Sequence, residues 1–372
     1  MSRVIEATKP KLLFFHNSLP EYRIAFWKEL GRYYNIILIV TDQDLEKKIY
    51  GFEIDKKGLE AHYINSINKS ELRTSIRKAD AVILPAIDRP KELLVSVYIR
   101  NICKVERKPY FYWNEKWVPP KDDQPLLKRI KNYIHKNMIL YASKGCNCYI
   151  ASGSRSQEYL QRIGIVKDKI EIAYDSNTSP RPEKSIDIKK QYNISQYSKI
   201  ILYLGRLVPR KGCRLLIDAV KELEEKETIV LLICGSGEDE AALRTQAGNS
   251  ENIIFAGKIQ PNQRRDYYEQ SDLFVLPSYI ENGVIEAWGL TINEALECGV
   301  PVVSTDAVGA AFDLIDDEVG TVIHEGDKNQ LKEAIIQNLN KGINRDICKK
   351  KYEEFSVQQM SKRFFEIING RV

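Results

Sequence analysis

Residues 273–303 read LFVLPSYIENGVIEAWGLTINEALECGVPVV. The stretch begins with a short apolar run at 273–276, and a second apolar run follows at 301–304. Between them, Gly289 and the pattern that begins near Leu290 predict a turn that leads into a helix. A buried strand, a helix and a second buried strand in this order are typical of a βαβ unit, which joins two parallel strands of one sheet.

The same alternation extends along the whole chain of 372 residues, a length that argues for two domains. We expect an α/β protein with two doubly wound, Rossmann-like domains at 1–176 and 198–347, joined by a Pro-, Ser- and Asn-rich linker at 175–197. In such sheets the ligand binds beyond the carboxyl ends of the strands, so two domains facing each other would leave a cleft. The first strand series is expected at 11–16, 35–41, 81–85, 110–114, 148–151 and 169–173, and the second at 199–203, 228–234, 252–255, 273–276, 301–304 and 321–323.

A glycine-rich turn with cations follows the first strand of the second series. Residues 205–212 read GRLVPRKG, and an apolar pattern of helical period begins directly after them. A tight turn at Gly205, the cations Arg206 and Lys211 and a nearby helix N-terminus are the parts of a phosphate or diphosphate site. Taken alone, the segment is as typical of an ordinary strand-to-helix turn with solvated basic side chains as it is of a phosphate site.

A pair of carboxylates gives the second signal. Glu286 and Glu294 have seven residues between them, and Gly289 stands in the turn before the helix. The backbone N–H groups of a helix start can hold an anion, and both carboxylates can accept hydrogen bonds from sugar hydroxyls. Together with Arg206 and Lys211, these residues predict a site for a nucleotide diphosphate sugar.

These motifs resemble those of a known enzyme family. The GRLxxxKG segment, the Pro-Ser before the first Glu, the segment EAWGLTINEAL and the following GVPVV strand closely resemble retaining glycosyltransferases of family 4, which have the GT-B fold. The resemblance is strong over about 200–325 and looser at HNSLPEYRIAFWKEL, residues 16–30. It implies that the last helix, at 348–372, packs back on the first domain.

The resemblance also implies roles for the donor-site residues. Arg206 and Lys211 would hold the donor diphosphate, Glu294 the ribose, and Glu286 the transferred sugar. A short Gly-x-Gly turn after the strand at 228–234 is either a nucleotide contact or an ordinary turn. The catalytic residues are therefore expected to be Arg206, Lys211 and Glu286, and the donor-binding residues Glu294, Trp288, Gly289, Leu290, Thr291, Gly205, Gly235 and Gly237.

The first half departs from the family pattern in two places. Many members carry a His after the strand that here ends at Asn114, but this chain continues with Glu115, so Glu115 or Asn114 is expected in its place. The usual motif after the last strand of the first domain is replaced by YDSN at 174–177, to which we assign no role. The acceptor-side residues are expected to be His16, Asn17, Arg23 and Glu115.

Composition and charge limit the class of protein and the kinds of binding partner. With 43% hydrophobic and 29% charged residues, we expect neither a disordered protein nor a membrane-spanning one, and we expect no secretory signal and no transmembrane helix. Residues 1–176 carry 31 Lys and Arg against 21 Asp and Glu, which suggests an anionic partner for the first half. The segment LLKRIKNYIHKNMIL at 126–140 is basic and amphipathic, so it is either a solvated helix face or a contact with an anionic membrane surface.

The functional expectation is a retaining, metal-independent hexosyltransferase that uses a sugar nucleotide and needs no cofactor. Its acceptor would be a lipid-linked or polysaccharide intermediate, and its place the cytoplasm, either free or at the inner face of the membrane. We expect no metal site and no nucleic-acid partner. A sugar-nucleotide 2-epimerase and a non-catalytic sugar-nucleotide-binding subunit remain as alternatives.

Overall fold

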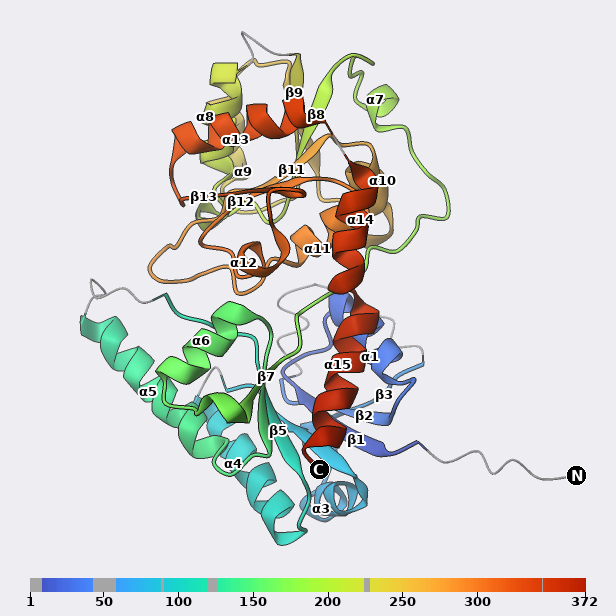
Figure 1. Ribbon diagram of the computed structural model, residues 1–372, viewed down its shortest axis with the longest axis vertical. Coiled ribbons are helices and arrows are strands. Elements are labelled where there is room, and N and C mark those ends of the chain that lie inside the picture. The colour runs from blue at the N-terminus through green and yellow to red at the C-terminus, as the bar shows by residue number, and fades with distance from the viewer. Residues whose placement is uncertain (1–8, 43–57, 88–89, 120–125, 224–227, 343) are drawn as a thin grey trace, which may run out of the picture. The chain divides into compact units, whose positions relative to one another are not determined.

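The computed structural model describes residues 9–42, 58–87, 90–119, 126–223, 228–342 and 344–372 (Figure 1). The chain divides into two compact units. Unit 1 contains residues 1–152, 156–174 and 357–372, and unit 2 contains residues 153–155 and 175–356. Each unit is a doubly wound parallel α/β sheet.

Unit 1 is built on a seven-stranded sheet with the order β3-β2-β1-β4-β5-β6-β7. All neighbouring strands are parallel. The strand order reverses between β1 and β4, which is where doubly wound sheets place their ligands. The strands are β1 (Lys11–His16), β2 (Asn35–Val40), β3 (Glu60–Tyr63), β4 (Ala81–Leu84), β5 (Tyr110–Asn114), β6 (Cys148–Ala151) and β7 (Ile170–Ile172).

The sequence analysis misses strand β3. Its residues Glu-Ala-His-Tyr alternate between exposed and half-buried positions at the sheet edge, so they form no apolar run. The six other strands of unit 1 are confirmed within one or two residues. They are apolar runs because helices cover both faces of a doubly wound sheet.

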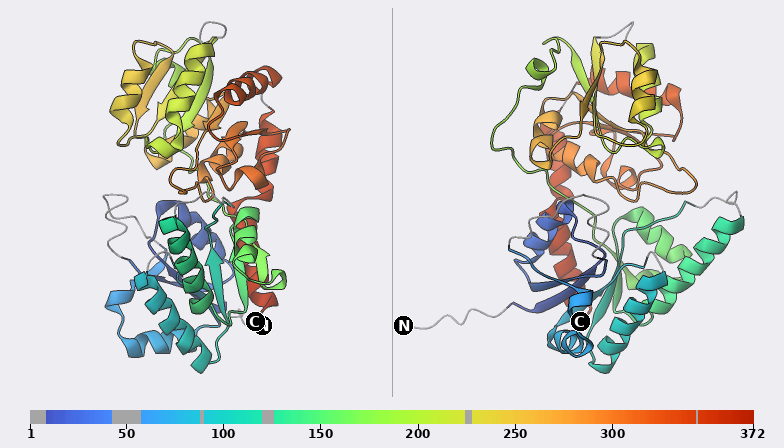
Figure 2. Two further views of the ribbon diagram at one scale, coloured as in Figure 1. Left: turned by 90° about the vertical axis from the view of Figure 1, so that its left-hand side faces the viewer. Right: turned by 180° about the vertical axis from the view of Figure 1, so that it is seen from behind.

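Helix α15 (Val357–Gly370) completes the core of unit 1. It lies beside α1 (Glu21–Leu30) in every view (Figures 1 and 2). Fully buried Phe364 contacts the rings of Phe26 and Trp113, at centroid distances of 5.0 and 5.4 Å. The other helices of unit 1 are η1 (Ile64–Ser66), α3 (Lys69–Lys78), α4 (Pro90–Val105), α5 (Leu126–Ala142), α6 (Ser154–Arg162) and η2 (Lys167–Lys169).

Unit 2 is built on a six-stranded parallel sheet with the order β10-β9-β8-β11-β12-β13. All six expected strands are confirmed within one or two residues. The strands are β8 (Lys199–Leu204), β9 (Ile229–Cys234), β10 (Ile253–Gly257), β11 (Leu273–Leu276), β12 (Val302–Thr305) and β13 (Gly320–Ile323). The helices are α7 (Ile188–Gln191), η3 (Pro209–Lys211), α8 (Cys213–Leu223), α9 (Glu240–Ala247), η4 (Pro261–Gln263), α10 (Arg264–Glu269), α11 (Leu290–Glu297), α12 (Ala311–Leu314), α13 (Lys328–Lys341) and α14 (Arg345–Glu354).

Two details differ from the sequence-based expectations. The single helix expected at 348–372 is interrupted at residues 355–356, where the Ser356 hydroxyl donates to the Glu353 carbonyl at 3.0 Å and competes with helix continuation. Helix α14 packs on α11 within unit 2, while α15 belongs to unit 1. Residues 175–197, expected as a linker, are part of unit 2: Ile186 N–H, for example, donates to Asp266 at 3.1 Å.

Candidate donor-binding site

The loops that follow β8 and β11 carry the residues expected to bind the donor. These two strands are neighbours, and the strand order of unit 2 reverses between them. The loops therefore lie at the switch point of the sheet, beyond its carboxyl edge. The backbone joins them directly, because Tyr279 N–H donates to the Arg210 carbonyl at 2.9 Å.

The turn after β8 is held in one conformation by close packing. Gly212 has φ +72°, and a Cβ atom there would lie 1.9 Å from the Pro277 carbonyl oxygen. Only glycine fits a position that needs both the left-handed backbone and this approach. Buried Tyr203 donates its hydroxyl to the Arg206 carbonyl at 3.0 Å. Lys211 thus sits at a fixed point before helix α8.

Glu286 lies beside two cations from this turn. Its Oε2 atom is 2.5 Å from Lys211 Nζ and 3.0 Å from Arg210 Nη1, and the three side chains are only 11–18% exposed. Burial lowers the pKa of Lys211, although the Glu286 charge acts in the opposite direction. Burial alone would raise the pKa of Glu286, but the charges and hydrogen bonds of Lys211 and Arg210 outweigh it and lower that pKa. Two basic side chains thus lie within 3.0 Å of one carboxylate oxygen.

The backbone fixes the position of Glu286. Its N–H donates to the Ala307 carbonyl at 3.3 Å, and its carbonyl accepts from Gly309 N–H at 3.1 Å. The long loop after β11 is therefore tied to the loop after β12. This pairing explains how a residue outside any regular strand can be held against Lys211.

Arg210 is a site residue that the sequence analysis does not select. The only sequence feature that could have identified Arg210 is its position next to Lys211 in GRLVPRKG. Arg206, which was selected, is exposed and makes no ion pair among the described residues. Its guanidinium thus remains in solvent at the rim of the loop.

Helix α11 begins where the sequence predicts. Gly289 precedes it with φ +104°, and a Cβ atom there would lie 2.7 Å from Val308 Cγ1. Leu290 and Thr291 form the first turn, whose N–H groups have no partner within the helix itself. Trp288 is 5% exposed and donates its indole N–H to Asn293 Oδ1 at 2.9 Å. Its ring is part of the packing beneath the turn.

Glu294 is buried in helix α11 and already has protein partners. Oε1 accepts from Asn177 at 2.7 Å and from Arg264 at 3.3 Å, and Oε2 accepts from the Tyr268 hydroxyl at 2.9 Å. Burial raises the pKa of the Glu294 carboxyl group above its usual 4.5, although the Arg264 charge and the hydrogen bonds lower it. An ionised carboxylate has about four acceptor positions, three of which these partners use, and a contact of Glu294 with a ribose hydroxyl stays a prediction.

Asn177 belongs to the YDSN turn to which the sequence analysis assigns no role. Its amide contact with Glu294 gives that turn a place in the candidate site. Asn177 comes from this turn, whereas Arg264 and Tyr268 both come from helix α10, and no sequence motif connects either segment with Glu294. Only the fold brings them around Glu294.

The Gly-x-Gly turn after β9 packs against the turn after β8. A Cβ atom on Gly235 would lie 1.8 Å from the Gly205 carbonyl oxygen, and one on Gly237 would lie 2.2 Å from the Leu207 carbonyl oxygen. Leu207 N–H donates to the Ser236 carbonyl at 3.0 Å, which closes the two turns onto each other. Both glycines are needed for this approach, so their structural role is clear, and a nucleotide contact stays a prediction.

Unit 1 brings three of the four acceptor-side residues together at the carboxyl edge of its sheet. Arg23 pairs with Glu115 Oε1, and His16 Nε2 lies 3.9 Å from Glu115 Oε2. His16 Nδ1 lies 2.6 Å from the Ser18 carbonyl oxygen. The Asn17 carbonyl accepts from Asp42 N–H at 3.0 Å, so Asn17 joins the loops beyond β1 and β2.

Asn114 and Glu115, the two residues expected in place of the family's His, differ in exposure and in partners. The Asn114 side chain is buried and donates to Ser156 Oγ at 2.7 Å. The Glu115 side chain is 33% exposed, and buried Arg23, whose guanidinium stacks 4.7 Å from the Trp113 ring, holds it in place. Glu115 is therefore the group that can reach a ligand.

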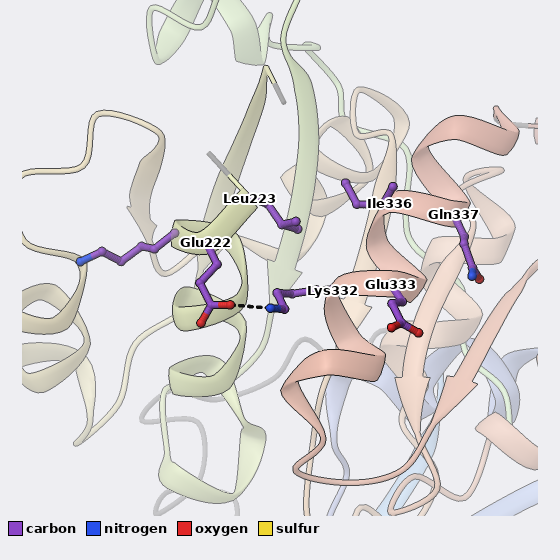
Figure 3. A pocket seen from close by; sticks show the side chains of 7 residues that line it. Glu222, Leu223, Lys332, Glu333, Ile336 and Gln337 are labelled. Atoms are coloured by element: carbon purple, nitrogen blue, oxygen red, sulfur yellow. Dashed lines mark hydrogen bonds and ion pairs between the residues drawn. The ribbon is translucent and has the colours of Figure 1, made fainter. Parts of the chain in front are cut away.

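One surface pocket of unit 2 is remote from these residues. A surface pocket of about 720 Å³ lies between the last turn of α8 and helix α13 (Figure 3). Glu222 there is paired with Lys328 and Lys332, each at 2.5 Å. Since α8 starts at the carboxyl edge of the sheet, its last turn lies toward the opposite edge, away from Lys211.

Two kinds of feature are absent from the described part of the chain. Among those residues, no group of three or more His, Cys, Asp or Glu side chains is arranged to hold a metal ion. No described helix is long and apolar enough to cross a membrane. Metal independence and location stay predictions.

Known proteins resemble this chain in sequence and in fold. Residues 184–355 match the family of "Glycosyl transferases group 1". The matched region contains Arg206, Lys211, Glu286 and Glu294. The chain is 28% identical over 200 residues to the uncharacterized glycosyltransferase MJ1607 of Methanocaldococcus jannaschii, covering 51% of this chain and 49% of the relative.

A second relative has a more specific name. The GDP-mannose-dependent monoacylated alpha-(1-6)-phosphatidylinositol monomannoside mannosyltransferase of Corynebacterium glutamicum is 31% identical over 172 residues, which cover 45% of each chain. The chain thus matches about half the length of these curated relatives. Among solved structures, Anabaena Alr3699/HepE in complex with UDP has a TM-score of 0.73 at 16% identity, with 97% of this chain and 100% of that chain covered. The fold is therefore GT-B, and the cleft expected between the two domains stays a prediction.

Proposed function

We propose that the chain is a retaining glycosyltransferase of family 4 that moves a hexose from a nucleotide diphosphate sugar to an acceptor. The observation that carries this proposal is the cluster of Lys211, Arg210 and Glu286 at the switch point of unit 2. The match of residues 184–355 to group 1 glycosyl transferases supports it. The solved neighbour with bound UDP supports a nucleotide donor.

In the proposed reaction, the bond between the anomeric carbon and the diphosphate breaks while the acceptor oxygen bonds to that carbon. Lys211, Arg210 and Arg206 stabilise the negative charge on the leaving diphosphate, together with the first-turn amides of helix α11. Glu286 holds the transferred sugar, and Glu294 accepts from the ribose. Attack occurs on the leaving-group face, and a donor phosphate oxygen takes the acceptor proton, so no separate base is needed.

The proposed acceptor is a lipid-linked or polysaccharide intermediate at the inner face of the membrane. The phosphatidylinositol monomannoside named for the Corynebacterium relative supports a lipid-linked class. In unit 1, Glu115 and His16 are proposed to contact the acceptor hydroxyls, while Arg23 holds the Glu115 carboxylate in place.

The first experiment is a donor screen. Thermal unfolding with UDP-, GDP- and ADP-sugars identifies the nucleotide, because a ligand that binds only the folded state raises Tm. Product analysis with that donor then tests the reaction. Release of the nucleoside diphosphate with sugar transfer or donor hydrolysis supports the proposal. An epimerised donor would indicate an epimerase, and binding without turnover would indicate a non-catalytic subunit.

A further inference from the structure

Helix α5 (Leu126–Ala142) carries an apolar ridge on its solvent-exposed face. Its position on the outside of unit 1, next to α4, can be followed in Figures 1 and 2. Six large apolar side chains of the helix are 46–75% exposed. They are Leu126, Leu127, Ile130, Tyr133, Ile134 and Tyr141.

The spacing of these residues places them on one face. Positions 126, 130, 133, 134 and 141 recur at helical intervals, and residue 127 lies at the side of the row. The opposite face packs on the protein: Ile139 and Ala142 are fully buried, and His135 Nε2 lies 2.7 Å from the Ile87 carbonyl oxygen. The ridge therefore does not belong to the core of unit 1.

Cations flank the ridge, and the helix contains no acidic residue. Arg129 and Lys131 are exposed on either side of Ile130, and Lys136 is half-exposed. None of the three makes an ion pair among the described residues. Lys128 belongs to the same basic segment, but its side chain lies outside the part of the chain that the structure describes. An apolar centre with a purely basic rim complements a surface that is apolar inside and anionic at its border.

We infer that α5 docks unit 1 on a bilayer that contains anionic lipids, with the ridge inserted between the headgroups and the cations at the phosphate level. Helices with a strongly apolar face and Lys or Arg at its border lie in the bilayer interface in this way. The sequence-based expectation leaves this segment as either a solvated helix face or a contact with an anionic membrane surface, and the inference adds the insertion of named apolar side chains. It is independent of the proposed reaction, because lipid binding is measured without donor or acceptor.

The test is co-sedimentation of the full chain with vesicles of phosphatidylcholine alone and of phosphatidylcholine with phosphatidylglycerol, at low and high salt. A ridge variant, Ile130→Ser with Ile134→Ser, is expected to bind the anionic vesicles at least about 10-fold more weakly, since each loses most of its apolar area for insertion. A rim variant, Arg129→Gln with Lys131→Gln, is expected to lose about fivefold per cation at low salt only, because salt screens that contribution.

A matched control removes exposed apolar side chains elsewhere. Val166 and Tyr197 are 66% and 92% exposed, and their joint change to Ser is expected to leave vesicle binding unchanged. Thermal unfolding checks that each variant is folded. Tyr133→Trp adds a direct reporter, whose emission is expected to shift to shorter wavelength on anionic vesicles.

Three results would overturn the inference. The wild type could fail to prefer anionic vesicles, or the folded ridge variant could bind as well as the wild type. Alternatively, light scattering could show a dimer that the ridge variant abolishes, with no lipid binding, which would make the ridge an interface between two copies of the chain.

Discussion

The ammonium group of Lys211 lies 2.5 Å from Oε2 of Glu286, although the two residues are far apart in the sequence. Without a donor, the carboxylate balances part of the charge of Lys211 and Arg210. A bound diphosphate would give these cations a second anionic partner, and Glu286 would then be free to turn toward the sugar. Under the proposed function, the contact would link diphosphate binding to sugar binding.

Lys211→Ala is expected to lower kcat by about 100-fold, because a cation that meets charge developed in the transition state contributes roughly 3 kcal/mol. The substitution is also expected to lower the free energy of unfolding, by at most about 3 kcal/mol, because it removes one of two cations beside a mostly buried carboxylate. We would measure kcat per folded molecule, together with the free energy of unfolding.

The matched control is Lys349→Ala, which removes an exposed lysine of the same unit and should change neither quantity. If Lys211→Ala lost stability but kept the wild-type kcat per folded molecule, Lys211 would be a structural residue only.

Glu294→Gln is expected to separate stability from donor binding. Because the folded pKa of Glu294 is raised, the folded state binds more protons than the unfolded state above pH 4.5. The stability of the wild type therefore falls as pH rises from 4.5 toward the raised pKa, and it stays lower above it. The amide of the variant does not titrate, so its free energy of unfolding has no such decrease. Relative to the wild type, the variant should therefore become more stable as pH rises over that range.

The same variant should bind the donor more weakly at neutral pH, since an amide oxygen accepts less strongly than a carboxylate. Unfolding titrations at several pH values and donor affinity give the two readouts. A stability difference that does not change with pH would show that folding does not raise the pKa of Glu294.

Gly235→Ala is expected to destabilise unit 2 by roughly 1–3 kcal/mol, because its methyl group would overlap the Gly205 carbonyl and force the two turns apart. Gly205→Ala is the control, since the nearest atom to its Cβ would be the Tyr203 hydroxyl oxygen at 3.5 Å, an ordinary van der Waals contact. Denaturant unfolding compares the two. Equal stability of both variants would mean that the turns are not closed onto each other.

Activity is expected to survive EDTA, because the proposed charge stabilisation comes from Lys211, Arg210, Arg206 and the amides of α11. Turnover would be measured with and without the chelator. Complete loss on chelation, followed by recovery with Mn²⁺ or Mg²⁺, would assign that stabilisation to a metal.

The sequence predicts the sheets well because both faces of each are covered, which makes a central strand such as β8 an uninterrupted apolar run. It misses β3, where only edge pairing defines the strand. The glycine turns and the start of α11 can also be predicted from the sequence, because a left-handed backbone conformation such as that of Gly289 favours glycine.

The side-chain partners are less accessible to sequence analysis. That Arg210 pairs with Glu286, and that Asn177 and Tyr268 bond Glu294, depends on long-range approach of loops with no shared motif. Conversely, the segment 175–197 has the composition of a linker, but its backbone is bonded to unit 2. Local composition cannot reveal such contacts.

The measurement that tests the central claim most directly is the release of nucleoside diphosphate from UDP-, GDP- and ADP-sugars, with the sugar product identified by mass spectrometry and NMR. Wild type and Lys211→Ala would be compared side by side. We predict that at least one donor yields its nucleoside diphosphate and a transferred or hydrolysed sugar, about 100-fold more slowly in the variant. An epimerised sugar nucleotide as the product, or equal rates for the two proteins, would contradict the account.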